Sequence, residues 1–239
     1  MLEYENYIFD LYGTLVDIRT NETKKYLWDK MAIFYSMNGA KYDSFEFKSK
    51  YKELCFREMD RHNNPEVEID IDYVFAELYR LKKVTPSNAL IKDTSTIFRT
   101  ISLEHICLYD GAKELLLTLK RKGKRVYLLS NAQYSFTMEE IKMLGIEDCF
   151  DKIYISSKVG YKKPSSNFFE ALIKNEKLDI KKSIMIGNDL ECDMNGAKKC
   201  GIDGFYILSN ISPKKDSLEN DIAKFSYNME EAYSEILKL

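Results

Sequence analysis

The chain has 239 residues, of which 45% are hydrophobic and 31% charged, and its formal net charge is −2. This balance is ordinary for a folded globular protein and gives no long-range electrostatic reason to expect a nucleic-acid or anionic-membrane partner. Charged residues interrupt every apolar run that could cross a bilayer, and the acidic N-terminus does not resemble a signal peptide.

The cysteine and histidine content favours a reducing, cytoplasmic environment. The five cysteines are an odd number without a CxxC pair, and there are only two histidines. This pattern disfavours a disulfide framework or a zinc site and indicates free thiols. His62 and His105 are too isolated along the chain to suggest a catalytic triad or a metal pair.

Five short apolar runs predict buried parallel strands, beginning with "NYIFD" at residues 6–10. The other four are residues 125–130, 152–157, 183–189 and 204–208. Each run is continuously apolar, as in strands that are covered on both faces. Helix-like segments over 111–123, 135–145, 165–177 and 191–201 alternate with them, and residues 229–239 predict a last packing helix. This alternation predicts an α/β fold, with a doubly wound, Rossmann-like parallel sheet and right-handed crossovers.

A long interval rich in helix formers separates the first strand from the others. Its helix-like segments are residues 21–39, 44–62, 71–83 and 87–105. An unstructured loop of this length is implausible, so the interval predicts a helical domain over residues 17–105, inserted into a core of residues 1–16 and 106–239. We expect Asp17 to cap or hinge the junction. The aromatic residues expected to form the inserted domain's own core include Trp28, Phe34, Tyr35, Phe45, Phe47 and Tyr51.

Polar residues follow four of the predicted strands. They are Asp10, Gly13 and Thr14 after the first strand, Ser130 and Asn131 after the next, then Lys163, and finally Asp189 with Asp193. An open α/β sheet binds its ligands at the carboxyl ends of the strands, so these residues are expected to meet there. A glycine turn, a hydroxyl and an ammonium group can hold an oxyanion, and the three carboxylates are hard oxygen ligands suited to Mg²⁺.

Four segments, in this order, resemble the motifs of the haloacid dehalogenase-like hydrolase superfamily. They are "DLYGTLVD", "LLSNA", "GYKKP" and "GNDLECDMNGAKKCG". The resemblance implies a hydrolase with a Rossmann-like core and a helical cap inserted after the first motif. Its implied activity is Mg²⁺-dependent hydrolysis of a small phosphorylated metabolite through an aspartyl-phosphate intermediate.

The resemblance also implies roles for single residues. Asp10 would be the nucleophile, in a turn formed by Gly13 and Thr14. Ser130 and the Asn131 backbone would contact phosphate. Lys163 would neutralise charge on the nucleophile and on the transferred group. The implied metal ligands are Asp10, the Tyr12 carbonyl, Asp189 and Asp193.

The chain departs from the family pattern at two positions. Tyr12 lies where phosphatases of the family usually carry an acid–base aspartate, and a phenol with an ordinary pKa of about 10 is a poor general acid. Good leaving groups such as acyl phosphates would tolerate this change better than alkyl phosphates. In the fourth motif Asn188 follows Gly187, so the acid is shifted to Asp189; we expect Asp189 to be the direct metal ligand, with Asp193 as the alternative.

Two other functions fit the same motifs. The tyrosine in the first motif also resembles the metal-independent 2-haloacid dehalogenases, in which the matching aspartate displaces halide from carbon. The arginines that could hold halide and substrate carboxylate are Arg19, Arg57 and Arg61, none with supporting spacing. The third possibility is a weakly catalytic member that binds a ligand through the same fold.

Overall fold

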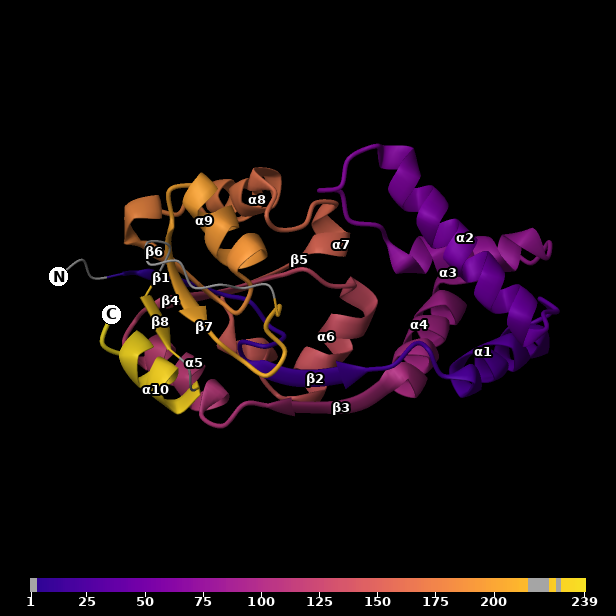
Figure 1. Ribbon diagram of the computed structural model, residues 1–239, viewed down its shortest axis with the longest axis horizontal. Coiled ribbons are helices and arrows are strands. Elements are labelled where there is room, and N and C mark those ends of the chain that lie inside the picture. The colour runs from indigo at the N-terminus through magenta and orange to yellow at the C-terminus, as the bar shows by residue number, and fades with distance from the viewer. Residues whose placement is uncertain (1–3, 215–223, 227–228) are drawn as a thin grey trace.

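The computed structural model describes residues 4–214, 224–226 and 229–239 and has a six-stranded parallel sheet at its centre (Figure 1). The strand order is β5-β4-β1-β6-β7-β8, with every neighbouring pair parallel. The strands are β1 (Asn6–Phe9), β4 (Arg125–Ser130), β5 (Lys152–Ile155), β6 (Ser183–Gly187), β7 (Asp203–Ile207) and β8 (Lys224–Ser226). The predicted doubly wound α/β fold is confirmed. Because the strands are parallel, their carboxyl ends share one edge of the sheet.

Helices cover both faces of this sheet (Figure 1). One face carries α5 (Ala112–Arg121), α6 (Tyr134–Met143) and α10 (Met229–Ile236), and the other carries α8 (Ser166–Glu176) and α9 (Gly196–Lys199). Strand β1 shows why both layers are needed. Tyr7 and Phe9 pack with the first layer and Ile8 with the second, since successive side chains of a strand point to opposite faces. The continuous apolar run therefore reflects burial on both sides.

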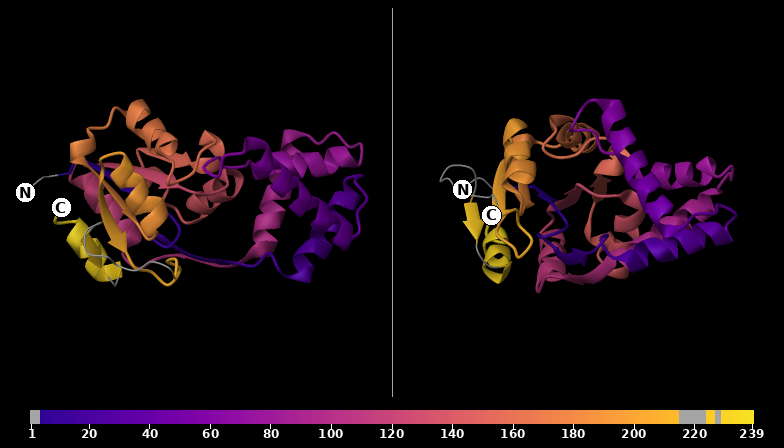
Figure 2. Two further views of the ribbon diagram at one scale, coloured as in Figure 1. Left: turned by 45° about the horizontal axis from the view of Figure 1, so that its top comes forward. Right: turned by 45° about the vertical axis from the view of Figure 1, so that its right-hand side comes forward.

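A helical insertion lies beside the core, as both views in Figure 2 show. It contains α1 (Lys25–Met37), α2 (Ser44–His62), α3 (Ile71–Leu81) and α4 (Asn88–Ser102). The chain leaves the core through β2 (Val16–Thr20) and returns through β3 (Leu103–Leu108), and these two strands pair antiparallel. We call this pair the hinge ribbon. The predicted helix over 87–105 is wrong in its last three residues, which start β3 and pair with a strand far back in the sequence.

The insertion has its own aromatic core. Trp28, Tyr35, Phe47 and Tyr51 are buried there as predicted, with Phe34 partly buried against them. Phe45 is 84% exposed, so its assignment to this core is wrong. On α2 it lies two positions from Phe47, and residues that far apart face different sides of a helix.

The insertion also contacts the core away from the hinge ribbon. Phe136 on α6 joins the insertion's aromatic core and stacks on Phe98 of α4, with ring centroids 6.0 Å apart. The segment before α3 pairs with the core, where Lys162 N donates to Glu66 O (2.9 Å) and Glu68 N to Gly160 O (3.1 Å). The insertion therefore contacts the core at two places besides the hinge ribbon, through α4 and through the segment before α3. None of the helices in the described residues is long and apolar enough to cross a membrane.

Candidate active site

The loop after β1 places Asp10 at the carboxyl edge of the sheet. Gly13 has φ +85°, and a Cβ there would lie 2.1 Å from the Asn188 side chain, so glycine is needed for both conformation and space. Thr14 Oγ1 donates to Asn188 Oδ1 at 3.4 Å, and Tyr233 OH on α10 donates to Thr14 O at 2.6 Å. These contacts hold the turn in place and fix the position of Asp10.

Lys163 is the centre of the site. Its Nζ lies 2.6 Å from Asp10 Oδ1 and 2.6 Å from Asp193 Oδ1, and only 2% of the side chain is exposed. Asn131 holds the lysine backbone from both sides, because Lys163 N donates to its Oδ1 (2.7 Å) and its Nδ2 donates to Lys163 O (2.9 Å). A buried ammonium is thus fixed between two carboxylates that come from different strand ends.

The two acids of the fourth segment differ in their surroundings. Asp193 uses both oxygens, since Oδ1 pairs with Lys163 and Oδ2 accepts from Asp189 N at 3.0 Å. A Cβ on Gly187 would lie 2.2 Å from Asp193 Oδ2, so only glycine lets this carboxylate approach β6. Asp189 accepts from Cys192 N through Oδ1 (2.8 Å) and lines the cavity. Of the two, Asp189 is better placed to reach a ligand.

The helix predicted over 191–201 has a different form. Residues Leu190–Asn195 form a π-helical turn, and α9 follows it. Short π-helical turns occur often at functional sites because they re-aim side chains. Here the turn carries Asp193, which reaches Lys163.

These groups surround a cavity of about 200 Å³. The lining residues are Asp10, Tyr12, Ser130, Asn131, Lys163, Asn188, Asp189, Cys192, Asp193, Ile211 and Pro213. Ser130 Oγ is buried and makes no hydrogen bond to any described residue. An unpaired buried hydroxyl is costly, so its place in the cavity wall suits a ligand oxygen.

Burial and charge set the protonation of this cluster. Burial alone would lower the pKa of Lys163, but the adjacent carboxylates of Asp10 and Asp193 outweigh it and raise that pKa. Burial raises the pKa of Asp193 against the opposing effect of Lys163. Burial, with the nearby Asp189 and Asp193, raises the pKa of the Cys192 thiol to about 12. Cys192 is therefore a neutral thiol at physiological pH and does not compete with Asp10 as a nucleophile.

Tyr12 belongs to a second buried cluster, at the junction with the insertion. Its hydroxyl donates to Glu140 Oε2 on α6 and lies 3.0 Å from Thr137 Oγ1. Glu140 also accepts from Arg99 Nε of α4, at 2.5 Å. Burial, and then the charge of Glu140, raise the pKa of Tyr12 far above its ordinary value. The phenol thus keeps its proton and directs it to Glu140.

Sequence reasoning did not identify Glu140 or Arg99. Both lie in ordinary amphipathic helices, and their pairing depends on how the insertion packs on α6. The arginines considered for a halide site are elsewhere. Arg19, Arg57 and Arg61 have side chains 69%, 65% and 63% exposed and pair with Glu104, Glu53 and Glu58, in that order. They do not line the Asp10 cavity, and among the described residues no arginine lines it.

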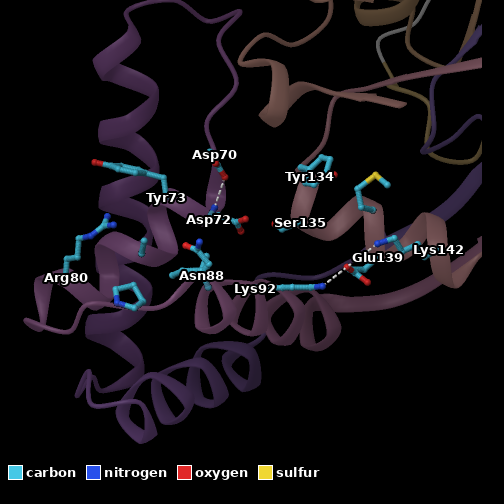
Figure 3. A pocket seen from close by; sticks show the side chains of 14 residues that line it. Asp70, Asp72, Tyr73, Arg80, Asn88, Lys92, Tyr134, Ser135, Glu139 and Lys142 are labelled. Carbon is cyan, nitrogen blue, oxygen red and sulfur yellow. Dashed lines mark hydrogen bonds and ion pairs between the residues drawn. The ribbon is translucent and has the colours of Figure 1, made fainter. Parts of the chain in front are cut away.

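A larger cavity of about 540 Å³ lies between the insertion and α6 (Figure 3). Its wall carries acidic and basic groups from both parts, including Asp72, Arg80, Lys92 and Glu139. It shares no lining residue with the cavity around Asp10. The cavity around Asp10 and this interdomain cavity are therefore separate.

Comparison with known proteins places the chain in one family. Residues 4–201 match the family model described as haloacid dehalogenase-like hydrolase. The chain belongs to this family and is a hydrolase.

Named relatives are similar over different lengths. A glyceraldehyde 3-phosphate phosphatase of Methanothermobacter thermautotrophicus is 30% identical over 114 residues, which is 47% of this chain and half of that protein. A Pyrococcus abyssi protein with the same description is 23% identical over 188 residues, covering 71% of this chain and 78% of the relative.

Solved structures show the same fold over the whole chain. The L-2-haloacid dehalogenase PA0810 superposes with a TM-score of 0.61 at 15% identity, covering 99% of this chain and all of that one. The Bacillus subtilis putative hydrolase YfnB, bound to magnesium, gives a TM-score of 0.55 at 17% identity, with coverage of 99% and 100%. At these identities the superpositions establish the fold.

Proposed function

We propose that the protein is a Mg²⁺-dependent phosphatase that hydrolyses a small phosphorylated metabolite through an aspartyl-phosphate at Asp10. The observation that carries the proposal is the fixed Asp10–Lys163 pair beside the unpartnered Ser130 hydroxyl. Phosphoryl transfer depends on positioning and on stabilising charge over the transferred oxygens, and these groups suit that task. The phosphatase relatives support this reading.

The chemistry has two steps. Asp10 attacks phosphorus with a carboxylate oxygen while the bond from phosphorus to the leaving oxygen breaks, and the leaving oxygen takes the electron pair. Water then attacks phosphorus of the aspartyl-phosphate as the bond between phosphorus and the Asp10 oxygen breaks. The protons of the water stay on the released inorganic phosphate, and Asp10 is regenerated as a carboxylate. Lys163, Ser130 and the amides of the Gly13–Thr14 turn would hold the transferred oxygens in both steps.

The donor set fits Mg²⁺. The cavity presents the carboxylates of Asp10 and Asp189, with Tyr12 in its wall, and these hard oxygen donors are the kind that Mg²⁺ prefers. When bound, the ion would polarise the phosphoryl group and offset its charge. Asp193 would act mainly by orienting Lys163 and the Asp189 backbone, because both of its oxygens are already engaged.

Tyr12 restricts the leaving groups. Its hydroxyl donates to Glu140, so it does not replace the missing acid–base aspartate. Protonating an alkoxide leaving group is typically worth about 10²–10⁴-fold in rate. We therefore infer a preference for leaving groups that depart without a proton, such as the carboxylate of an acyl phosphate.

We also propose that residues 17–105 act as a cap that closes over the site, with residues 1–16 and 106–239 as the catalytic core. The backbone of Glu66 and Glu68 in the insertion forms hydrogen bonds with Lys162 and Gly160, which lie just before Lys163 in the sequence. The insertion therefore contacts the core close to the proposed catalytic lysine. Closure would exclude water and select the substrate. A cytoplasmic location accords with small phosphorylated substrates and free thiols.

Dehalogenase chemistry is the second candidate, favoured by Tyr12 itself. Halide leaves without a proton, so this tyrosine would cost nothing in such a reaction. Against it, a metal-independent site does not need the acids Asp189 and Asp193 for binding a cation, and Arg19, Arg57 and Arg61 are exposed and pair with other residues.

The deciding experiment compares phosphate esters, acyl phosphates and 2-haloacids, each with Mg²⁺ and with chelator. We expect Mg²⁺-dependent phosphate release, fastest with acyl phosphates. Chelator-resistant halide release without phosphate release would refute the phosphatase proposal. Tight ligand binding with no turnover of any substrate would identify a binding protein instead.

A further inference from the structure

Three metal-ligating side chains meet on the exposed face of the hinge ribbon. Asp17 on β2 lies directly opposite Cys107 on β3 in the strand register, and His105 precedes Cys107 by two positions. Residues two apart on a strand share a face, and Ile18 and Ile106 between them pack toward the hydrophobic core. The ribbon thus directs its apolar side inward and this cluster outward.

Two of the three donor separations are close to those of a tetrahedral metal site. Cys107 Sγ lies 3.3 Å from His105 Nε2, and His105 Nε2 lies 3.6 Å from Asp17 Oδ2. All three donor atoms lie within 4.8 Å of one another. Zinc bonds of about 2.3 Å to sulfur and about 2.0 Å to nitrogen or oxygen, at tetrahedral angles, give separations of roughly 3.5 Å and 3.3 Å. The donors are already close to ligand distance.

A neighbouring residue orients the carboxylate. Asn210 Nδ2 donates to Asp17 Oδ1 at 3.0 Å, which leaves Oδ2 facing His105. Hydrogen bonds of this kind orient the ligands of protein metal sites. His105 and Asp17 have 42% and 25% of their side chains exposed and Cys107 is exposed, so an ion can enter from solvent.

The donor types select a class of metal. Thiolate and imidazole favour borderline and soft ions such as Zn²⁺, whereas the catalytic cavity presents oxygen donors suited to Mg²⁺. Binding would release the Cys107 thiol proton to solvent, because the thiolate is the ligand. Three protein ligands leave the fourth position to water.

We propose that Asp17, His105 and Cys107 bind one Zn²⁺-class ion that ties β2 to β3. Both chain connections between the core and the insertion run through this ribbon. A cross-link here stiffens the hinge and restrains movement of the insertion relative to the core. The proposal does not depend on the reaction catalysed at Asp10.

The test titrates Co²⁺, and then Zn²⁺, into reduced, metal-free protein with excess Mg²⁺ present to occupy oxygen-donor sites. Wild type should bind one Co²⁺ with a near-ultraviolet thiolate charge-transfer band. Cys107→Ser should abolish the band. His105→Ala removes a direct ligand and should weaken Zn²⁺ binding by more than the ~10–100-fold loss that is typical of outer-shell partners. Zn²⁺ should also raise the thermal midpoint of wild type but not of Cys107→Ser.

Two cysteine variants are matched controls. Cys55→Ser changes a thiol within the insertion, and Cys192→Ser changes the thiol that lies beside the catalytic carboxylates. Both should retain the band. A band that persists in Cys107→Ser, or wild type without stoichiometric Co²⁺ binding, would overturn the proposal and leave the cluster as a hydrogen-bonded surface group. Circular dichroism of the metal-free variants checks that each one folds.

Discussion

The loop after β1 contributes residues to two buried ionic clusters. The two clusters differ in their surroundings, because one lines a cavity and the other is packed between helices. The cluster proposed to be catalytic, called the catalytic cluster below, consists of Asp10, Lys163 and Asp193. The junction cluster consists of Tyr12, Glu140 and Arg99. Both combine a cation with at least one carboxylate at low exposure. Asp10 and Tyr12 are only two positions apart, yet they belong to different clusters.

The catalytic cluster opens onto a cavity, whereas the junction cluster is closed by helix packing. In the first, Lys163 and the unpaired Ser130 hydroxyl line a space that can receive a ligand. In the second, Glu140 accepts from both Tyr12 and Arg99, so its charge is already satisfied. The first arrangement suits binding and chemistry, and the second suits holding α4 against the core. Tyr12 therefore takes part in the second arrangement through its hydroxyl, although it lies in the loop that carries Asp10.

The largest expected effect concerns the catalytic cluster. Asp10→Asn keeps the side-chain shape but removes the nucleophile, so turnover should fall by about 10⁴-fold or more. Phosphate release under saturating substrate measures it, with the exposed Asp110→Asn as a matched substitution. Comparable rates in Asp10→Asn and wild type would remove Asp10 from the mechanism.

The junction cluster should matter next, and for stability. Arg99→Met leaves the Glu140 carboxylate buried without its cation, which should cost about 3–5 kcal/mol of unfolding free energy. Denaturant unfolding measures this cost. Adding Glu140→Leu to the same chain should restore part of the loss, because the unpaired charge is then gone.

The same two helices supply a control pair. Lys92 on α4 and Glu139 on α6 lie 3.2 Å apart with side chains 68% and 43% exposed. Lys92→Met should therefore cost less than about 1 kcal/mol. Equal losses for Arg99→Met and Lys92→Met would show that the junction cluster contributes no more than a surface ion pair.

Sequence patterns predicted that Asp10, Ser130, Lys163 and Asp189 meet at one edge of the sheet, because each of them follows a strand. Asp10, Ser130 and Asp189 come at or just after the carboxyl ends of strands, and Lys163 follows β5 after the short helix α7 (Ser156–Val159). A parallel sheet brings those strand ends together whatever the details of packing. The π-helical turn that carries Asp193 was not predictable in the same way, since it depends on the contact with Lys163.

The junction cluster and the hinge ribbon required the structure. Glu140 and Arg99 meet because two amphipathic helices pack at one particular angle and register, and neither helix carries a local signal for it. The hinge ribbon pairs short strands that are separated by the whole insertion, so Asp17, His105 and Cys107 are distant in sequence but adjacent in space. Local periodicity reports the face that a residue occupies and not its partner across a domain boundary.

Changing Tyr12 to an acid should have a moderate effect on rate. Tyr12→Asp would offer a general acid near the leaving group and should raise turnover of alkyl phosphates by about 10- to 100-fold, with little gain for acyl phosphates. The ratio of the two rates measures this. A folded Tyr12→Asp protein with an unchanged ratio would mean that leaving-group protonation does not limit alkyl ester hydrolysis.

The smallest expected effect is that of Tyr12→Phe, which distinguishes a structural role of the Tyr12 hydroxyl from a role as general acid. Tyr12→Phe removes the hydroxyl that donates to Glu140 and should cost about 1–2 kcal/mol of unfolding free energy, because a buried carboxylate loses one donor. Alkyl phosphate turnover should change by less than about threefold, since a phenol whose pKa is raised by burial and by Glu140 does not protonate the leaving group. A general acid would behave differently, and its loss would lower that turnover by about 100-fold or more without affecting acyl phosphates to the same extent. Stability and alkyl phosphate rate, measured on this one variant, therefore assign Tyr12 either to the junction cluster or to the chemistry at Asp10.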